Sequence, residues 1–96
     1  MQYLFQGRPT EAVRRDPPPD LMDKVRGDWA TSREYYAQGV IRQMWTSGIG
    51  VYAICEAESR EQLEALFSAM PMAAANLIEF EIFELKPYRG FAPEPA

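Results

Sequence analysis

The sequence changes its pattern at Gly39, and this change constrains the fold more than any other feature. Residues 21–38 carry apolar side chains at spacings of three and four, which predicts a helix that Asp20 can cap. Residues 40–46 alternate instead, as a strand does. Glycine suits the junction because it adopts the left-handed conformation that ends many helices without a steric penalty. The chain is therefore expected to run from a helix directly into a strand.

Three further strands and a second helix are predicted around this junction. The strands are expected where side chains alternate or form a short apolar run, over residues 1–7, 51–57 and 77–85. The second helix should cover residues 60–69. It begins after Ser59, which forms a capping box with Gln62, and it ends before Pro71.

Three segments carry no regular pattern. Residues 10–19 are charged and rich in proline, which favours extended backbone, and we expect them to form a loop over the mouth of a pocket. Arg14 and Arg15 within it are either solvated, as loop residues usually are, or meet an acidic ligand. Residues 72–76 are expected to form a loop of small side chains, and residues 86–96 an irregular tail.

The order strand, helix, strand, strand, helix, strand is that of the ferredoxin-like fold. This α+β fold has a four-stranded antiparallel sheet with two helices on one face. With 96 residues, 47% of them hydrophobic, residues 1–96 are expected to form a single domain. The side chains expected beneath the helices are Val25, Trp29, Leu63, Leu66 and Phe67.

The other face of the predicted sheet carries Trp45 and Tyr52 as well as apolar neighbours. Aromatic side chains of this size are rarely left open to water over a whole face. A second subunit packed on this face, as in a dimeric α+β barrel, would cover them and enclose a cavity. We therefore expect a homodimer or a higher homo-oligomer.

Composition excludes several classes of function. The net charge of −4 argues against nucleic acid and anionic membranes as partners, because both are recognised through basic surfaces. No stretch approaches the ~18 apolar residues of a membrane span and no secretory signal is found, so a cytoplasmic location is predicted. The chain has no histidine, which removes Cys/His and Ser/His/Asp catalysis and disfavours zinc. Neither a metal nor a cofactor is expected. The single cysteine, Cys55, lies in an apolar run and should be a small buried hydrophobe rather than a reactive thiol.

Residues 40–46 also supply candidates for a ligand-binding wall. In a regular strand Gln43 would share one face with Ile41 and Trp45, while Arg42 would point to the other. A polar residue between two large apolar ones is typical of a partly polar cavity wall. The alternative is that Gln43 lies at the solvated surface of the sheet.

Four short segments resemble the muconolactone Δ-isomerase-like family, whose small ferredoxin-like chains form dimeric α+β barrels. They are residues 39–45 (GVIRQMW), 59–63 (SREQL), 70–72 (MPM) and 78–80 (IEF). The spacing Gly-x-x-Arg-x-x-Trp is the most specific of these features. The resemblance covers residues 20–88 and is one of pattern and spacing. It implies a cavity in which a small cyclic or unsaturated acid undergoes proton transfer.

Two positions depart from the pattern of this family. Histidine typically lies between the arginine and the tryptophan, where this chain has Gln43. Glutamine can hold a carbonyl or hydroxyl group but cannot act as an acid or a base near neutral pH. An aromatic-rich segment of the family is replaced by Ala73, Ala74 and Ala75, which would enlarge or open that part of the site. The same reaction is therefore not expected from the same residues.

Without histidine, a catalytic base would have to be a carboxylate or a tyrosine. Glu79 and Glu81 share one face of the last predicted strand, and burial in an apolar barrel would raise the pKa of either carboxyl toward neutrality. Both could instead be solvated at a sheet edge or a subunit rim. Tyr52 and Tyr36 could donate a hydrogen bond to an enolate or a carbonyl oxygen, or could be ordinary packed aromatics.

Two functions of different classes fit these observations. The first is a small-molecule isomerase or cyclase in which one of the two glutamates is the base and Tyr52 assists. The second is a non-catalytic ligand-binding or assembly protein of the same fold, and a cofactor-free oxygenase is a third alternative. The ligand-binding side chains would be Arg42, Gln43, Trp45, Trp29 and Tyr36, with Arg14 as a second candidate to attract an acid group.

Overall fold

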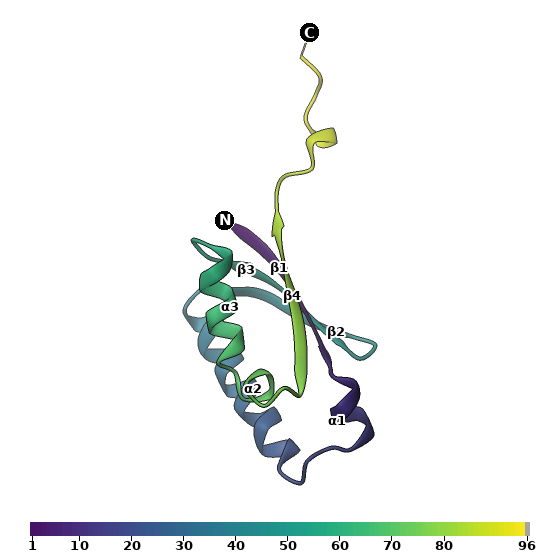
Figure 1. Ribbon diagram of the computed structural model, residues 1–96. Helices are drawn as coiled ribbons and strands as arrows, with labels where there is room; N and C mark the ends of the chain where they lie inside the picture. Colours follow the sequence, from purple (N-terminus) through teal and green to yellow (C-terminus); the bar gives the residue numbers. More distant parts are fainter. Residues whose placement is uncertain (96) are drawn as a thin grey trace.

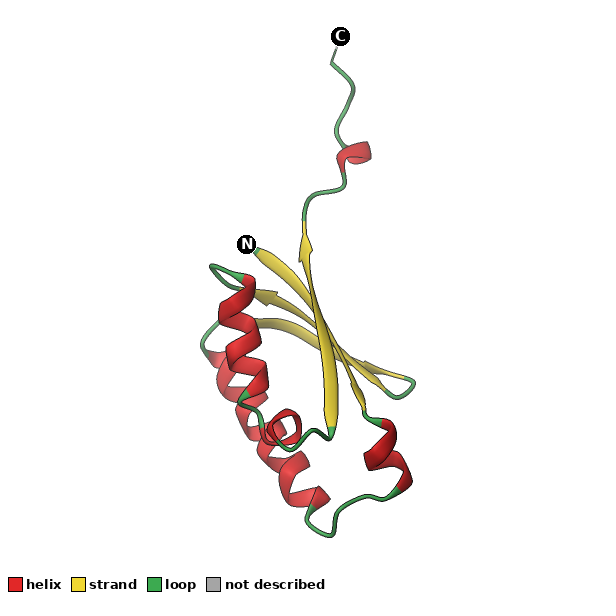
Figure 2. Ribbon diagram, viewed as in Figure 1, coloured by secondary structure: helices red, strands yellow, loops and turns green. Residues whose placement is uncertain are grey.

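The computed structural model describes residues 1–95, which form a sheet covered on one face by helices (Figure 1). The elements in chain order are β1 (Gln2–Pro9), α1 (Glu11–Arg15), α2 (Leu21–Ala37), β2 (Ile41–Ser47), β3 (Gly50–Glu56), α3 (Arg60–Ser68), α4 (Pro71–Ala74), β4 (Ile78–Leu85) and the 3₁₀ turn η1 (Arg89–Phe91). The four strands form one antiparallel sheet in the order β2-β3-β1-β4. Helices α2 and α3 lie on the same face of it (Figure 2). The predicted ferredoxin-like α+β fold is confirmed.

The helix boundaries marked in the sequence are confirmed by local contacts. Gly39 adopts a left-handed φ of 83° and directly follows Gln38, the C-cap residue of α2. At the start of α3, the backbone N–H of Gln62 donates to the Ser59 hydroxyl at 3.2 Å. The Gln62 side chain in turn accepts from the backbone N–H of Glu58 at 3.0 Å. These contacts satisfy backbone groups that a helix end would otherwise leave open.

The core lies between the covered face of the sheet and the helices. Phe67 of α3 is almost fully buried at its centre and stacks on Phe5 of β1, with ring centroids 4.1 Å apart. Tyr35 of α2 meets Phe67 edge-on at 6.0 Å, and its hydroxyl donates to the carbonyl of Leu66 at 2.8 Å. One buried aromatic cluster therefore joins α2, α3 and the sheet.

Helix α2 is rotated relative to the prediction. Trp29 was expected beneath the helices but is 54% exposed, and Tyr36 is 64% exposed, whereas Tyr35 is buried. Apolar residues at spacings of three and four fit two neighbouring stripes of this helix equally well. Contact with the aromatic cluster selects the stripe that carries Tyr35, so the expected burial of Trp29 is wrong.

Strand β2 contains a bulge that reverses the alternation of its side chains. The register shifts between Ile41 and Gln43, so Arg42 is the extra residue. Ile41 and Met44 pair with fully buried residues of β3, whereas Trp45 pairs with a residue of the opposite face. The prediction that Ile41 shares a face with Gln43 and Trp45 is therefore wrong, because one inserted residue moves all later side chains across the sheet.

Two segments expected to be loops contain short helices. Residues 10–19 include α1, whose N-terminus is capped by Thr10 through a bond from the backbone N–H of Val13 at 3.4 Å. Val13 is buried, and the prolines follow the helix without interrupting it. Pro71 does not only end α3 but also opens α4, since proline is tolerated in the first turn of a helix.

The second face of the sheet is not covered by any helix of residues 1–95 (Figure 2). Strand alternation places polar residues such as Gln6 and Glu81 on it beside apolar ones such as Leu4, Ile54 and Phe83. Phe83 is 40% exposed. We call this surface the open face.

Cys55 lies in the middle of β3, between Tyr3 of β1 and Ile41 of β2. It is fully buried, as predicted, and burial raises the pKa of its thiol to about 12. At the C-terminal end of β4 the chain leads away from the sheet (Figure 1), and Tyr88 and Phe91 there are exposed. Within residues 1–95 no helix has the length and apolarity to cross a membrane.

Candidate functional site

A largely apolar pocket of about 560 Å³ opens between α2 and the covered face of the sheet. Its volume falls within the range of ~300–1,000 Å³ that is common for small-molecule sites. We call it the helix–sheet pocket. Its apolar walls are formed by Phe5, Val25, Met44, Val51, Phe67, Met70, Met72, Ala73, Ile78 and Phe80. The polar residues along it are Asp28, Ser32, Arg33 and Thr46, and Trp29 and Trp45 also border it.

Asp28 is the single carboxylate among the residues that line the helix–sheet pocket. One of its oxygens accepts a hydrogen bond from the backbone N–H of Met72 at 3.0 Å. Burial raises the pKa of this carboxyl, and the bond from Met72 opposes the rise without cancelling it. Asp28 is therefore a carboxylate that takes up a proton more readily than one in water does.

A close approach of two helices holds Asp28 in this position. A Cβ atom added to Gly27 would lie 2.9 Å from Cγ of Pro71, so only glycine leaves room for α4 beside α2 at this point. The approach brings the N–H of Met72 to the Asp28 carboxylate. The glycine that weakens α2 as a helix, by about 1 kcal/mol relative to alanine, thus positions the acid.

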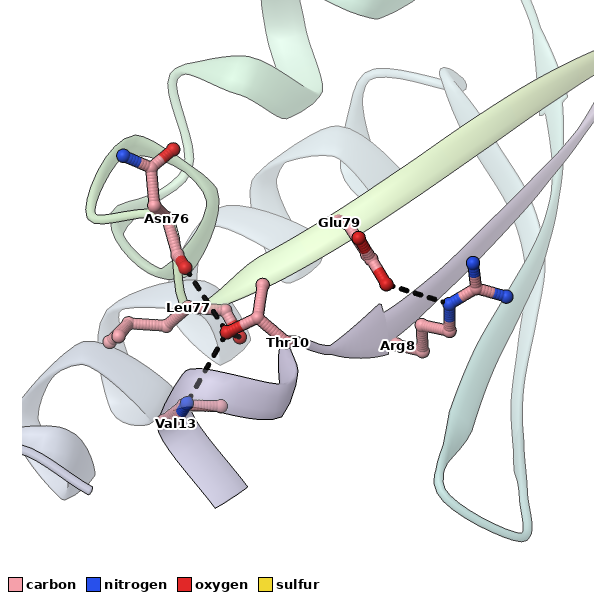
Figure 3. A network of polar contacts seen from close by, with 6 residues as sticks. All are labelled: Arg8, Thr10, Val13, Asn76, Leu77 and Glu79. Carbon is pink, nitrogen blue, oxygen red and sulfur yellow. Dashed lines mark hydrogen bonds and ion pairs between the residues drawn. The ribbon is translucent and has the colours of Figure 1, made fainter. Parts of the chain in front are cut away.

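A second concave region of about 530 Å³ lies against the open face, at the turn between β2 and β3. We call it the open-face hollow. Its lining is rich in polar side chains, which are Gln6, Arg8, Ser47, Tyr52, Glu79 and Glu81. Glu79 pairs with Arg8 across β1 and β4, with Nε and Oε1 2.9 Å apart, and both side chains are 56% exposed (Figure 3). This carboxylate is therefore paired at the surface rather than enclosed in an apolar pocket.

A small network beside this pair connects the ends of β1 and β4 (Figure 3). The Thr10 hydroxyl donates to the carbonyl of Asn76 at 3.2 Å, and the Thr10 backbone N–H donates to the carbonyl of Leu77 at 3.0 Å. The same hydroxyl caps α1. These bonds fix the start of β4, and with it the side chains that alternate between the two faces.

The structure divides the residues predicted for the site between these two regions. Glu79, Glu81 and Tyr52 come together in the open-face hollow, while Trp29 and Trp45 border the helix–sheet pocket. The remaining predicted ligand contacts, Arg42, Gln43 and Tyr36, border neither region, and Arg14 does not either. The single cavity expected from the sequence is thus two, on opposite faces of one sheet.

Sequence reasoning missed Asp28 and Arg33. Asp28 follows Val25 by three residues and precedes Ser32 by four, so the helical spacing that predicted an inner face for these two also included the acid. An acid on an otherwise inward-facing stripe was the available signal. Within residues 1–95 no group of three or more potential ligands is arranged to hold a metal ion.

Comparison with solved structures finds two similar folds. A crystal structure of muconolactone isomerase superposes with a TM-score of 0.73 at 14% sequence identity, over 93% of this chain and 92% of that one. The fold is that of muconolactone isomerase. The 5-chloro-2-hydroxyhydroquinone dehydrochlorinase of Burkholderia phenoliruptrix AC1100, solved in complex with 2,5-dihydroxybenzoquinone, gives a TM-score of 0.70 at 17% identity. That likeness covers 94% of this chain and 98% of the dehydrochlorinase.

The likeness to muconolactone isomerase is one of fold. The sequence matches no model of a known protein family and no curated protein. The resemblance expected from residues 20–88 therefore holds for the architecture, along nearly the whole length of both solved structures. The chemistry has to be argued from the side chains of this chain.

Proposed function

We propose that the chain catalyses proton transfer on a small unsaturated or cyclic acid bound in the helix–sheet pocket. The observation that carries this proposal is the position of Asp28. It is the one carboxylate on a mostly apolar wall, it is held by the N–H of Met72, and burial raises its pKa. A general base of this kind is most effective when its pKa is shifted toward the working pH.

The reaction would be an isomerisation without redox change. The Asp28 carboxylate removes a proton from a carbon beside a conjugated carbonyl group, and the electron pair of the broken C–H bond moves into the conjugated system. The carboxyl then returns the proton to another carbon of that system, so a double bond has moved and no atom is gained or lost. Ser32 and Thr46 also line the pocket, and their hydroxyls could donate to the oxygen that becomes negative.

Two features support this proposal. The two solved neighbours, an isomerase and a dehydrochlorinase, carry names of small-molecule enzymes. Ala73 lines the pocket where a larger side chain would fill it, in agreement with the space expected from the alanine segment. Both features suit a ring-sized ligand between α2 and the sheet.

The test is hydrogen exchange in D₂O, followed by NMR on muconolactone and related unsaturated lactone acids. The wild-type chain should exchange the acidic C–H of at least one of them. Asp28→Asn keeps an oxygen for the N–H of Met72 but cannot take the proton, and it should slow the exchange by about 10²–10⁴-fold. Glu81→Gln is the matched control. If Glu81→Gln abolished exchange and Asp28→Asn did not, the base would be in the open-face hollow, as the sequence suggested.

Binding without catalysis is the second candidate function. It is favoured by the mostly apolar walls, since an apolar pocket can hold a hydrophobic metabolite without any proton transfer. The same NMR samples distinguish the two functions. Line broadening of a ligand without any deuterium uptake would establish a binding protein and overturn the proposed reaction.

We propose in addition that two copies pair through the open face, as the sequence suggested for a homodimer. The apolar side chains Leu4, Ile54 and Phe83 on this face have no cover within residues 1–95. Sedimentation velocity should then give a dimer for the wild type and a monomer for Phe83→Lys. Met22→Lys, at an exposed position of α2, is the control and should remain a dimer. A monomeric wild type would contradict this pairing.

A further inference from the structure

The helix–sheet pocket has two charged lining residues of opposite sign. Asp28 and Arg33 both come from α2, five residues apart, which corresponds to a rise of about 7.5 Å along the helix. The pKa of Asp28 responds to burial and to the N–H of Met72, and no cation contributes to it. The acid and the guanidinium therefore act at separate places along the pocket.

Arg33 differs from the other cations of α2 in having no acidic partner. Lys24 pairs with Asp20 at 3.2 Å, and Arg26 pairs with Asp23 at 3.8 Å. Within residues 1–95 no ion pair of Arg33 is found, and no acid lies three or four residues from it along the helix. Its side chain is exposed at the pocket, so it can bind an anion without first giving up a salt bridge.

Trp29 lies one helical turn before Arg33, and both border the pocket. A planar ring that enters here would contact the indole, while a carboxylate on that ring could accept two parallel hydrogen bonds from the guanidinium. Asp28 lies further along the helix toward its N-terminus. The order along α2 is thus an acid, an aromatic ring and a cation.

We propose that Arg33 anchors the carboxylate of the ligand at the edge of the helix–sheet pocket, so that the site accepts ring compounds with a single acid group and admits them ring first. This inference rests on the proposed function, because it assigns a substrate class to the same pocket. A second carboxylate on the ring would have to lie between apolar walls near Asp28, where desolvation and repulsion both oppose it. The site therefore discriminates against diacids.

The inference is tested by binding, independently of turnover. Trp29 borders this pocket one helical turn from Arg33, so intrinsic fluorescence reports on its occupation. Three probes of equal ring size are titrated: cyclohex-1-ene-1-carboxylate, its neutral primary amide, and the 1,4-dicarboxylate, whose second acid group lies at the opposite end of the ring. For the wild type we expect the monoacid to bind at least about tenfold more tightly than either of the others, as one charge-assisted pair contributes.

Arg33→Gln should weaken binding of the monoacid about tenfold and leave the amide unchanged. Arg33→Lys should restore part of the loss, because it returns the charge without the planar geometry. Arg26→Gln is the matched control, because Arg26 lies two helical turns before Arg33 on the same helix and outside the pocket. This variant should bind all three probes as the wild type does. Equal affinities for Arg33→Gln and Arg26→Gln would overturn the inference, and so would a wild type that binds none of the probes.

The two proposals fail separately. If Asp28→Asn stops proton exchange while the affinity for the monoacid does not change in Arg33→Gln, the proposed reaction is supported and the role of Arg33 as an anchor is wrong. If monoacid affinity depends on Arg33 while exchange survives in Asp28→Asn, the anchor stands and the proposed base is wrong.

Discussion

The two hollows of this protein flank the same sheet and have nearly equal volumes, about 560 Å³ for the helix–sheet pocket and about 530 Å³ for the open-face hollow. They differ in the surroundings of their carboxylates. Asp28 is half-buried and carries a raised pKa, whereas Glu79 is exposed and paired with Arg8. A concave shape alone therefore does not make an acid useful for catalysis. Removal of the acid from water, without a cation beside it, raises its pKa, as the proposed role of Asp28 requires.

The largest expected effect is on the free energy of unfolding, and it distinguishes the covered face of the sheet from the open face. Phe67→Ala removes the ring at the centre of the aromatic cluster and should lower the free energy of unfolding by about 3–5 kcal/mol. Phe83→Ala, on the open face and 40% exposed in the single chain, should cost less than about 1 kcal/mol at dilutions where the chain is monomeric. Urea unfolding followed by circular dichroism measures both. Equal losses would mean that the open face is buried, and would strengthen the case for a partner there.

A bulky side chain should block one hollow and spare the other. Ala73→Phe places a ring in the helix–sheet pocket and should reduce the affinity for a ring acid at least about tenfold, since the ligand and the new ring compete for one volume. Ser47→Phe makes the same addition to the open-face hollow and should leave that affinity unchanged. Fluorescence titration compares the two variants. The opposite result would move the ligand to the open face.

The raised pKa of Asp28 should contribute to the pH dependence of the free energy of unfolding. The folded chain holds this proton more tightly than the unfolded chain does, so the folded state binds more protons between the ordinary value of 3.8 and the raised pKa. The free energy of unfolding should therefore fall as pH rises through that window. Asp28→Asn should lack this contribution, so its stability relative to the wild type should grow with pH. Parallel curves for the two proteins would show that the carboxyl is not desolvated.

The smallest effect is expected for the pair of Arg8 and Glu79. Both side chains are exposed, and an exposed ion pair gains little because water and salt screen it. Glu79→Gln should leave the unfolding midpoint almost unchanged. Addition of 1 M NaCl should shift the unfolding midpoint of the wild type by no more than this substitution does. A marked loss of stability at low salt would show that the hollow is shielded from water, for example by a second subunit.

The fold could be predicted from local patterns because each boundary had a residue with a physical reason to be there. Gly39 ends a helix, Ser59 begins one, and the strands alternate, so the order of elements followed. The bulge at Arg42 could not be predicted, because it depends on which residue of β3 lies opposite. Helix α1 was missed because the prolines behind it outweighed the cap that Thr10 supplies.

The candidate site was harder to predict than the fold because its key contact joins residues that are far apart in the sequence. Asp28 owes its position to Met72, which lies 44 residues away, and to the space that Gly27 leaves for Pro71. Local patterns contain no such information. The glutamates of β4 were attractive in sequence because they alternate with apolar residues, yet alternation says only which face they share.

The reactivity of the single cysteine can report on how often the sheet opens. Cys55 is enclosed by β1 and β2, and a thiol with a pKa of about 12 hardly ionises at neutral pH while the chain is folded. An alkylating reagent can therefore reach and react with it only in molecules whose central strands have separated. The slow labelling of a single sulfur atom would count those opening events under native conditions, without denaturant and without any engineered probe.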